Sequence, residues 1–135
     1  MATRLYKAGW ATTDTPGDIV HLYASVNTSG NYNVFSIGTS GSYQVPASKT
    51  LYITDINMYS SNANIHATLY YGDTAVTNSA AAPTNAIQIS TSYASPTANT
   101  LTHISCFIAV PAQKYPHIRS GNSDGLNINV TGIVV

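Results

Sequence analysis

The chain has 135 residues, only 7% of them charged, and its formal net charge is zero. This length predicts a single domain whose core needs no disulfide or metal for stability. The chain lacks the basic stripe that neutralises nucleic-acid phosphates, so we expect no nucleic-acid partner.

The sequence also predicts no membrane partner. No apolar run approaches the roughly 20 residues that a membrane span requires. The first ten residues, MATRLYKAGW, lack the apolar core of a signal peptide, so we expect synthesis in the cytoplasm. A near-neutral surface of Ser, Thr, Asn and Tyr gives little repulsion between copies and favours association.

The N-terminal residues 1–17 are expected to form an arm or an edge strand, and residues 18–135 a β-domain. Leu5, Tyr6 and Trp10 are too few to form the apolar face of a helix. The Pro-Gly and Asp content of the following segment predicts a loop.

Two strands are predicted next. Residues 19–26 alternate, with an inward set of Val20, Leu22, Ala24 and Val26. The segment NTSGN then predicts a turn, and residues 32–37 a short second strand.

The stretch from residue 42 to residue 73 shows the clearest β-pattern. Residues 43–45 are extended and end at Pro46. Residues 50–58 predict a strand with Tyr52, Thr54, Ile56 and Met58 on one face, while Leu51 and Ile53 make the other face apolar at its start. Residues 64–71 alternate cleanly, with one face formed by Ile65, Ala67, Leu69 and Tyr71.

The second half of the chain begins with loops over residues 77–100, which contain one extended run at 86–89. Loops this long usually pack on a neighbour or have a function. Residues 101–110 predict a strand, and 115–119 an edge strand because Pro116 interrupts it. After a turn at SGNSDG, residues 126–135 predict a final strand. About eight short antiparallel strands without helical periodicity indicate a β-sandwich or barrel.

One short motif occurs twice. Residues 45–49, VPASK, return as VPAQK at residues 110–114. Two turns could have reached the same solution independently, because proline is common at turn corners. Alternatively, each half of a doubled Greek-key sandwich carries one such corner.

The sequence around these motifs resembles a jelly-roll module of structural proteins from tailed bacteriophages. The resemblance covers residues 43–71, beginning YQVPASKTLYITDI, and residues 107–135, FIAVPAQKYPHIRSGNSDGLNINVTGIVV. Ser48 stands where the family pattern usually has glycine. The resemblance implies a single-domain jelly roll and, for a short chain, a capsid decoration (cement) protein. It implies no catalytic residue.

No motif for catalysis, metal or cofactor binding is present, so we expect neither an enzyme nor a cofactor. The histidines His21, His66, His103 and His117 lack metal-ligand spacing. Cys106 lies in an apolar run and is expected to be a buried thiol. Asp55, within a strand, is expected to be a satisfied polar group rather than a partner contact.

Aromatic residues with polar tips are the best candidates for a partner or oligomer interface. They are found in the N-terminal segment and on the polar face of residues 64–71. The candidates are Leu5, Tyr6, Trp10, His66 and Tyr70.

Together these features predict a decoration protein on the capsid surface of a virion. Its partners would be the major capsid protein and itself, with a homotrimer favoured over a dimer. The N-terminal segment and the 77–100 loops are further contact candidates. The alternative is a carbohydrate- or receptor-binding module of a phage tail fibre, because one fold serves many functions.

Overall fold

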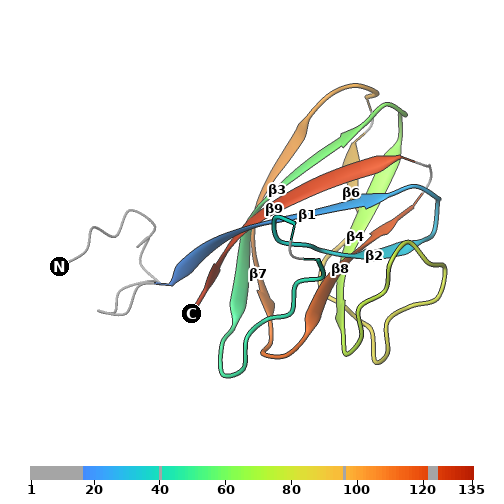
Figure 1. Ribbon diagram of the computed structural model, residues 1–135. Coiled ribbons are helices and arrows are strands. Elements are labelled where there is room, and N and C mark those ends of the chain that lie inside the picture. The colour runs from blue at the N-terminus through green and yellow to red at the C-terminus, as the bar shows by residue number, and fades with distance from the viewer. Residues whose placement is uncertain (1–16, 40, 96, 122–124) are drawn as a thin grey trace.

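The computed structural model describes residues 17–135, except residues 40, 96 and 122–124. Within this part the chain forms nine strands and no helix, arranged in two antiparallel sheets (Figure 1). The predicted all-β sandwich is therefore confirmed. The strands are β1 (Asp18–Val26), β2 (Tyr32–Val34), β3 (Leu51–Ser60), β4 (Ile65–Gly72), β5 (Ile87–Gln88), β6 (Tyr93–Ser95), β7 (Thr102–Val110), β8 (Tyr115–Ser120) and β9 (Leu126–Val134).

The strands pair in the nested order of a jelly roll. Sheet A has the order β1-β9-β3-β7, and sheet B has β2-β8-β4, with β5 and β6 both on the far side of β4. The first strand thus pairs with the last, the second with the last but one, and successive pairs fall alternately in the two sheets. Together β5 and β6 fill the eighth strand position of the fold.

The core lies between the sheets and is formed by alternate residues of the long strands. On β1, Leu22, Ala24 and Val26 are buried, as the alternation predicted. Strand β4 of sheet B contributes Ile65, Ala67 and Leu69 to the same core. Strand β9 contributes Leu126, Ile128, Val130 and Val134.

A β-bulge in β3 corrects the predicted faces of that strand. Ile53 pairs with Gly132 but Asp55 pairs with Thr131, so Thr54 is an extra residue opposite β9. The extra residue reverses the alternation. The buried side chains of β3 are therefore Leu51, Ile53, Ile56, Met58 and Ser60, and the prediction of Tyr52 and Thr54 on one face with Ile56 and Met58 was wrong.

The prediction that residues 115–119 lie at an edge was also wrong, because β8 lies between β2 and β4. Pro116 has no N–H to offer to the chain beside it. Beside β8, the Phe35 N–H donates to the Pro116 carbonyl at 3.0 Å, but Pro116 cannot donate in return. The Phe35 carbonyl accepts a hydrogen bond from the Tyr43 N–H at 2.7 Å in its place. The replacement donor lets proline occupy an interior strand.

The two VPAxK motifs form matching turns that lie side by side. In both, the fourth residue has a left-handed backbone, with φ of 60° at Ser48 and 64° at Gln113. The N–H of Val45 donates to the Lys114 carbonyl at 3.0 Å, and the Gln113 N–H donates to the Val45 carbonyl at 2.8 Å. The repeated sequence thus produces two corners at one end of the sandwich, joined by backbone hydrogen bonds.

We expect the Ser48→Gly variant to be more stable by about 0.5–1 kcal/mol, because glycine adopts the left-handed region without a Cβ penalty. Ala47→Gly is the matched control, since Ala47 is in the same turn without a positive φ. This control should lose stability because it only adds backbone freedom to the unfolded chain. Urea unfolding at neutral pH measures both, and a less stable Ser48→Gly would contradict the expectation.

Candidate functional site

The outer face of sheet B, here called face B, carries a cluster of aromatic and polar side chains. Residues directly opposite each other on neighbouring strands share a face. Tyr32 of β2 is opposite Arg119 of β8, which is opposite Thr68 of β4. In the next row, His117 lies between Val34 and Tyr70, and Tyr70 is opposite Gln88.

Three of these side chains form one contact cluster. The rings of Tyr32 and Tyr70 meet edge to face, with centroids 5.2 Å apart and an interplanar angle of 74°. The Arg119 guanidinium lies 5.4 Å from the Tyr32 ring centroid, within range of a cation–π contact. Arg119 Nε also donates to the Gly30 carbonyl at 3.3 Å. These contacts hold the cluster in place before any partner binds.

Polar groups border the rings. The Tyr70 hydroxyl donates to Gln88 Oε1 at 3.3 Å, and Gln88 Nε2 donates to the Ser90 carbonyl at 2.8 Å. Burial, followed by the nearby Tyr32, raises the pKa of Tyr70, so its hydroxyl stays protonated at neutral pH. The surface thus offers a hydroxyl, an amide and a guanidinium around two rings.

The structure places two of the five predicted interface residues on face B. His66 and Tyr70 both point outward from β4, and His66 Nδ1 lies 3.4 Å from Ser92 Oγ. Leu5, Tyr6 and Trp10, and the arm to which they were assigned, lie outside the described residues. Tyr32, Arg119 and Gln88 were missed because they come from three other strands. The alternation of residues along each strand could assign each of these side chains to an outer face. Only the pairing of the strands shows that they lie next to one another.

The loop between β4 and β5 covers one end of face B. The Val76 N–H donates to His117 Nε2 at 3.0 Å, and His117 Nδ1 donates to the Tyr115 carbonyl at 2.9 Å. His117 points outward from the sheet but is 0% exposed. Farther along, residues 76–79 run beside β2, where the backbones of Tyr32 and Ser79 exchange hydrogen bonds of 2.8 and 3.0 Å. Much of the predicted 77–100 loop region therefore packs on its own sandwich and includes β5 and β6.

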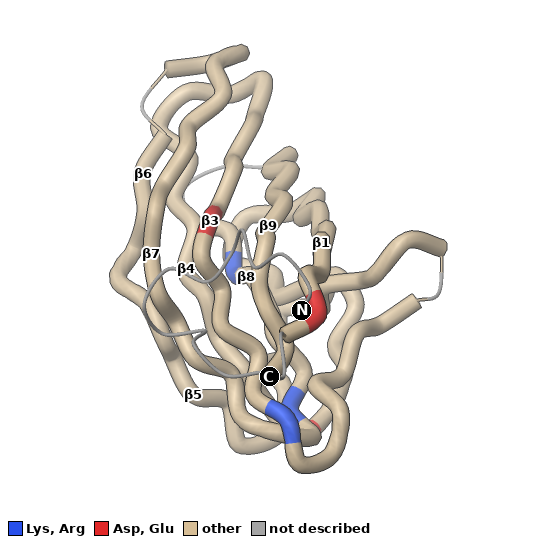
Figure 2. The backbone as a smooth tube through the Cα atoms, turned by 90° about the vertical axis from the view of Figure 1, so that its left-hand side faces the viewer, with Lys and Arg blue, Asp and Glu red and all other residues tan. Residues whose placement is uncertain are grey.

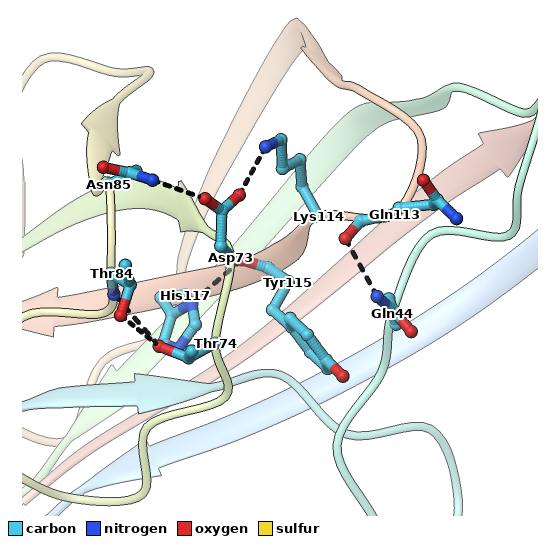
Figure 3. A network of polar contacts seen from close by, with 9 residues as sticks. All are labelled: Gln44, Asp73, Thr74, Thr84, Asn85, Gln113, Lys114, Tyr115 and His117. Carbon is cyan, nitrogen blue, oxygen red and sulfur yellow. Dashed lines mark hydrogen bonds and ion pairs between the residues drawn. The ribbon is translucent and has the colours of Figure 1, made fainter.

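An ion pair attaches this loop to the second VPAxK turn. Asp73 pairs with Lys114 and accepts a hydrogen bond from Asn85 Nδ2 at 2.6 Å (Figure 3). Hydrogen bonds from Lys114 and then Asn85 lower the pKa of Asp73. Nearby, Gln44 Nε2 donates to the Gln113 carbonyl at 2.9 Å, which joins the first turn to the second. These contacts join the loop after β4 to the second VPAxK turn, and that turn to the residue just before the first.

The outer face of sheet A, here called face A, is broader and has few charged groups. Among the outward side chains of its four strands that the structure describes, Asp55 is the only acid. Asp55 accepts from Thr54 Oγ1 at 3.0 Å and contacts His103 Nε2 at 3.1 Å. Tyr52 and Phe107 stack with centroids 5.0 Å apart. Figure 2 shows few charged residues in the described part of the chain, with two basic segments next to each other at the lower end of the molecule.

Cys106 is half-buried, so the prediction of a buried thiol was only partly correct. It points inward from β7, but β7 is the last strand of sheet A and leaves its side partly uncovered. Burial, followed by Asp55, raises the pKa of the Cys106 thiol to about 11. The thiol is therefore protonated at neutral pH and is a poor nucleophile.

The described part of the chain contains neither a metal-binding cluster nor a membrane-spanning helix. No group of three or more His, Cys, Asp or Glu residues there could hold a metal ion. No helix in that part is both long and apolar enough to cross a bilayer. Comparisons with protein-family models, curated proteins and solved structures found no match.

Proposed function

We propose that this chain is a capsid decoration protein of a tailed bacteriophage, which is made in the host cytoplasm and binds the assembled head through face B. The observation that carries the proposal is the Tyr32–Tyr70–Arg119 cluster. Tyrosine and arginine dominate the binding energy of protein interfaces, because they bury a large area and also hydrogen-bond. The jelly-roll strand order and the resemblance of residues 43–71 and 107–135 to phage structural proteins agree with this role.

The proposed mechanism is mass action. A protein that binds the assembled shell, but not free capsid subunits, stabilises the shell by its binding free energy. Several copies of face B in one oligomer would raise avidity without requiring a strong single contact. Because the described surface has few charges, binding should depend only weakly on salt.

Co-sedimentation with expanded heads that lack this protein tests the role of face B. We expect Tyr70→Ala to weaken binding about 30-fold, the effect of losing a contact worth roughly 2 kcal/mol. Tyr23→Ala is the matched control, because Tyr23 is a 48% exposed tyrosine on face A. The control should bind within about twofold of the wild type, since effects below 0.5 kcal/mol are the norm for surface positions. Equal losses in the two variants, with both still folded, would exclude face B.

Recognition of a carbohydrate is the second candidate function. The observation that favours it is the pair of tyrosine rings bordered by the Gln88 amide and the Arg119 guanidinium, a combination that can stack on a sugar and bond to its hydroxyls. A glycan array separates the two functions. Decoration of the capsid predicts no bound glycan, whereas a tail-fibre module predicts binding that Tyr70→Ala abolishes.

A further inference from the structure

Two of the four sheet edges are covered or short, and β1 is bridged at Tyr23. Among the described residues, β7 is the long edge without such a backbone bridge. On β1, Tyr23 exchanges backbone hydrogen bonds of 2.9 and 2.8 Å with Ser36. Residues 76–79 cover β2, as described above. The fourth edge consists only of β5 and β6, which have two and three residues. By contrast, β7 has nine residues and pairs only with β3.

The sequence of β7 has no charged residue or proline to protect it as an edge strand, and its one irregularity is a register shift against β3 between Ser105 and Ile108. Proteins place lysine, proline or bulges on exposed edges to prevent further pairing. The strand THISCFIAV has no Lys, Arg, Asp, Glu or Pro. Its inward residues Ile104, Cys106 and Ile108 pack against the core but stay half-buried, because no neighbouring strand lies beyond them. Another strand along this edge would cover them.

We propose that β7 pairs with β7 of a second copy of this chain, antiparallel about a two-fold axis, so that the two A sheets become one continuous sheet. A nine-residue strand is centred on its fifth residue, which here is Cys106. Full overlap therefore places Cys106 opposite the Cys106 of the second copy and Ile104 opposite its Ile108. The half-buried apolar residues of the two copies then cover one another.

The backbone geometry fits this pairing. Inward residues of β7 direct their N–H and C=O groups toward β3, so outward residues such as His103, Ser105 and Ala109 direct theirs toward the open edge. In full overlap, His103 lies opposite Ala109 of the second copy, and such a pair can exchange two backbone hydrogen bonds. No charge on β7 opposes a like charge, and the chain as a whole carries no net charge.

The two-fold arrangement also sets the size of the assembly. Pairing uses the β7 edge of both copies, so this two-fold contact closes at a dimer. This differs from the trimer that the sequence favoured. Because the axis is perpendicular to the joined sheet, both B faces lie on the same side of the dimer. The pairing is independent of what face B binds.

Size exclusion with multi-angle light scattering tests the proposal. The protein is loaded at about 50 μM, a concentration at which weak dimers form. We expect a mass of twice the 14.3 kDa chain for the wild type. Ser105→Lys should give a monomer, because it places two added charges near the axis and a lysine on the edge. Asn127→Lys, which adds the same charge to the central strand β9 on the same face, should remain a dimer. Circular dichroism confirms that each variant folds.

Cross-linking tests the register. With a copper oxidant, the wild type should form a disulfide-linked dimer through Cys106, since opposed residues of this kind have Cα atoms within disulfide range. In a Cys106→Ser background, Ile104→Cys mixed with Ile108→Cys should cross-link, whereas Ile104→Cys alone should not. A monomeric or trimeric wild type, a dimer insensitive to Ser105→Lys, or cross-linking by Ile104→Cys alone would overturn the proposal. Loss of head binding with an intact dimer would instead contradict only the proposed function.

Discussion

The Gly132→Val variant is expected to lose about 3 kcal/mol of folding free energy, at the upper end of overpacking effects. A Cβ atom at Gly132 would lie 2.7 Å from Leu51 Cδ1 and 2.8 Å from the Tyr52 carbonyl oxygen. The second of these atoms is backbone and belongs to the strand that carries the bulge, so it cannot move without disturbing the pairing of β3 with β9. Glycine at this position permits the close approach of the two strands.

Thermal unfolding measures this loss, which should lower the melting temperature by about 10 °C for a domain of this size. Asn129→Val is the matched control, because it adds a similar side chain to an exposed position of the same strand. The control should change stability by less than about 0.5 kcal/mol. A Gly132→Val variant as stable as the control would show that β3 and β9 are not packed as described.

The second large effect concerns His117, whose burial should make the fold less stable in mild acid. Burial lowers the pKa of His117, and the Val76 N–H needs its neutral Nε2 as an acceptor. Below pH about 6.5, the usual histidine pKa, the unfolded chain binds a proton that the folded chain resists. Stability should therefore fall as the pH decreases from about 7 toward the lowered pKa of the folded state, where the loss levels off.

Urea unfolding at pH 7.5 and 5.0 measures this dependence, and two variants isolate its source. His117→Leu should cost about 1–3 kcal/mol at pH 7.5, because it leaves the Val76 N–H without an acceptor, and should remove much of the pH dependence. His103→Gln should retain that dependence, since His103 is exposed on face A. If His117→Leu were as sensitive to acid as the wild type, His117 would not be the group that titrates.

The sequence predicted the strands best where alternation is regular. The pattern of β1, β4 and β9 identified their buried faces, because each of these strands has one side in the core. It failed at Thr54, because this extra residue exchanges the inward and outward faces of β3. No local signal in the sequence distinguishes such a bulge from a strand covered on both sides. It also failed for β8, because the donor that replaces the missing N–H of Pro116 comes from Tyr43, far away in the sequence.

Less of the candidate site could be predicted. Alternation found His66 and Tyr70 as outward residues of one strand, but gave no indication that Tyr32 and Arg119 lie beside them. That cluster depends on the order of β2, β8 and β4, which is a property of the whole topology. The half-exposure of Cys106 has the same origin, since the sequence alone does not identify β7 as an edge.

Titration of expanded phage heads with this protein most directly tests whether the chain is a decoration protein. The heads should be those of the phage to which the proposal assigns the chain, purified without the protein, and the bound protein is measured after sedimentation. We predict binding that saturates at a fixed number of copies per head, is reduced by Tyr70→Ala, and is absent with unassembled capsid subunits. Failure of the folded wild-type protein to sediment with heads at any concentration would contradict the account.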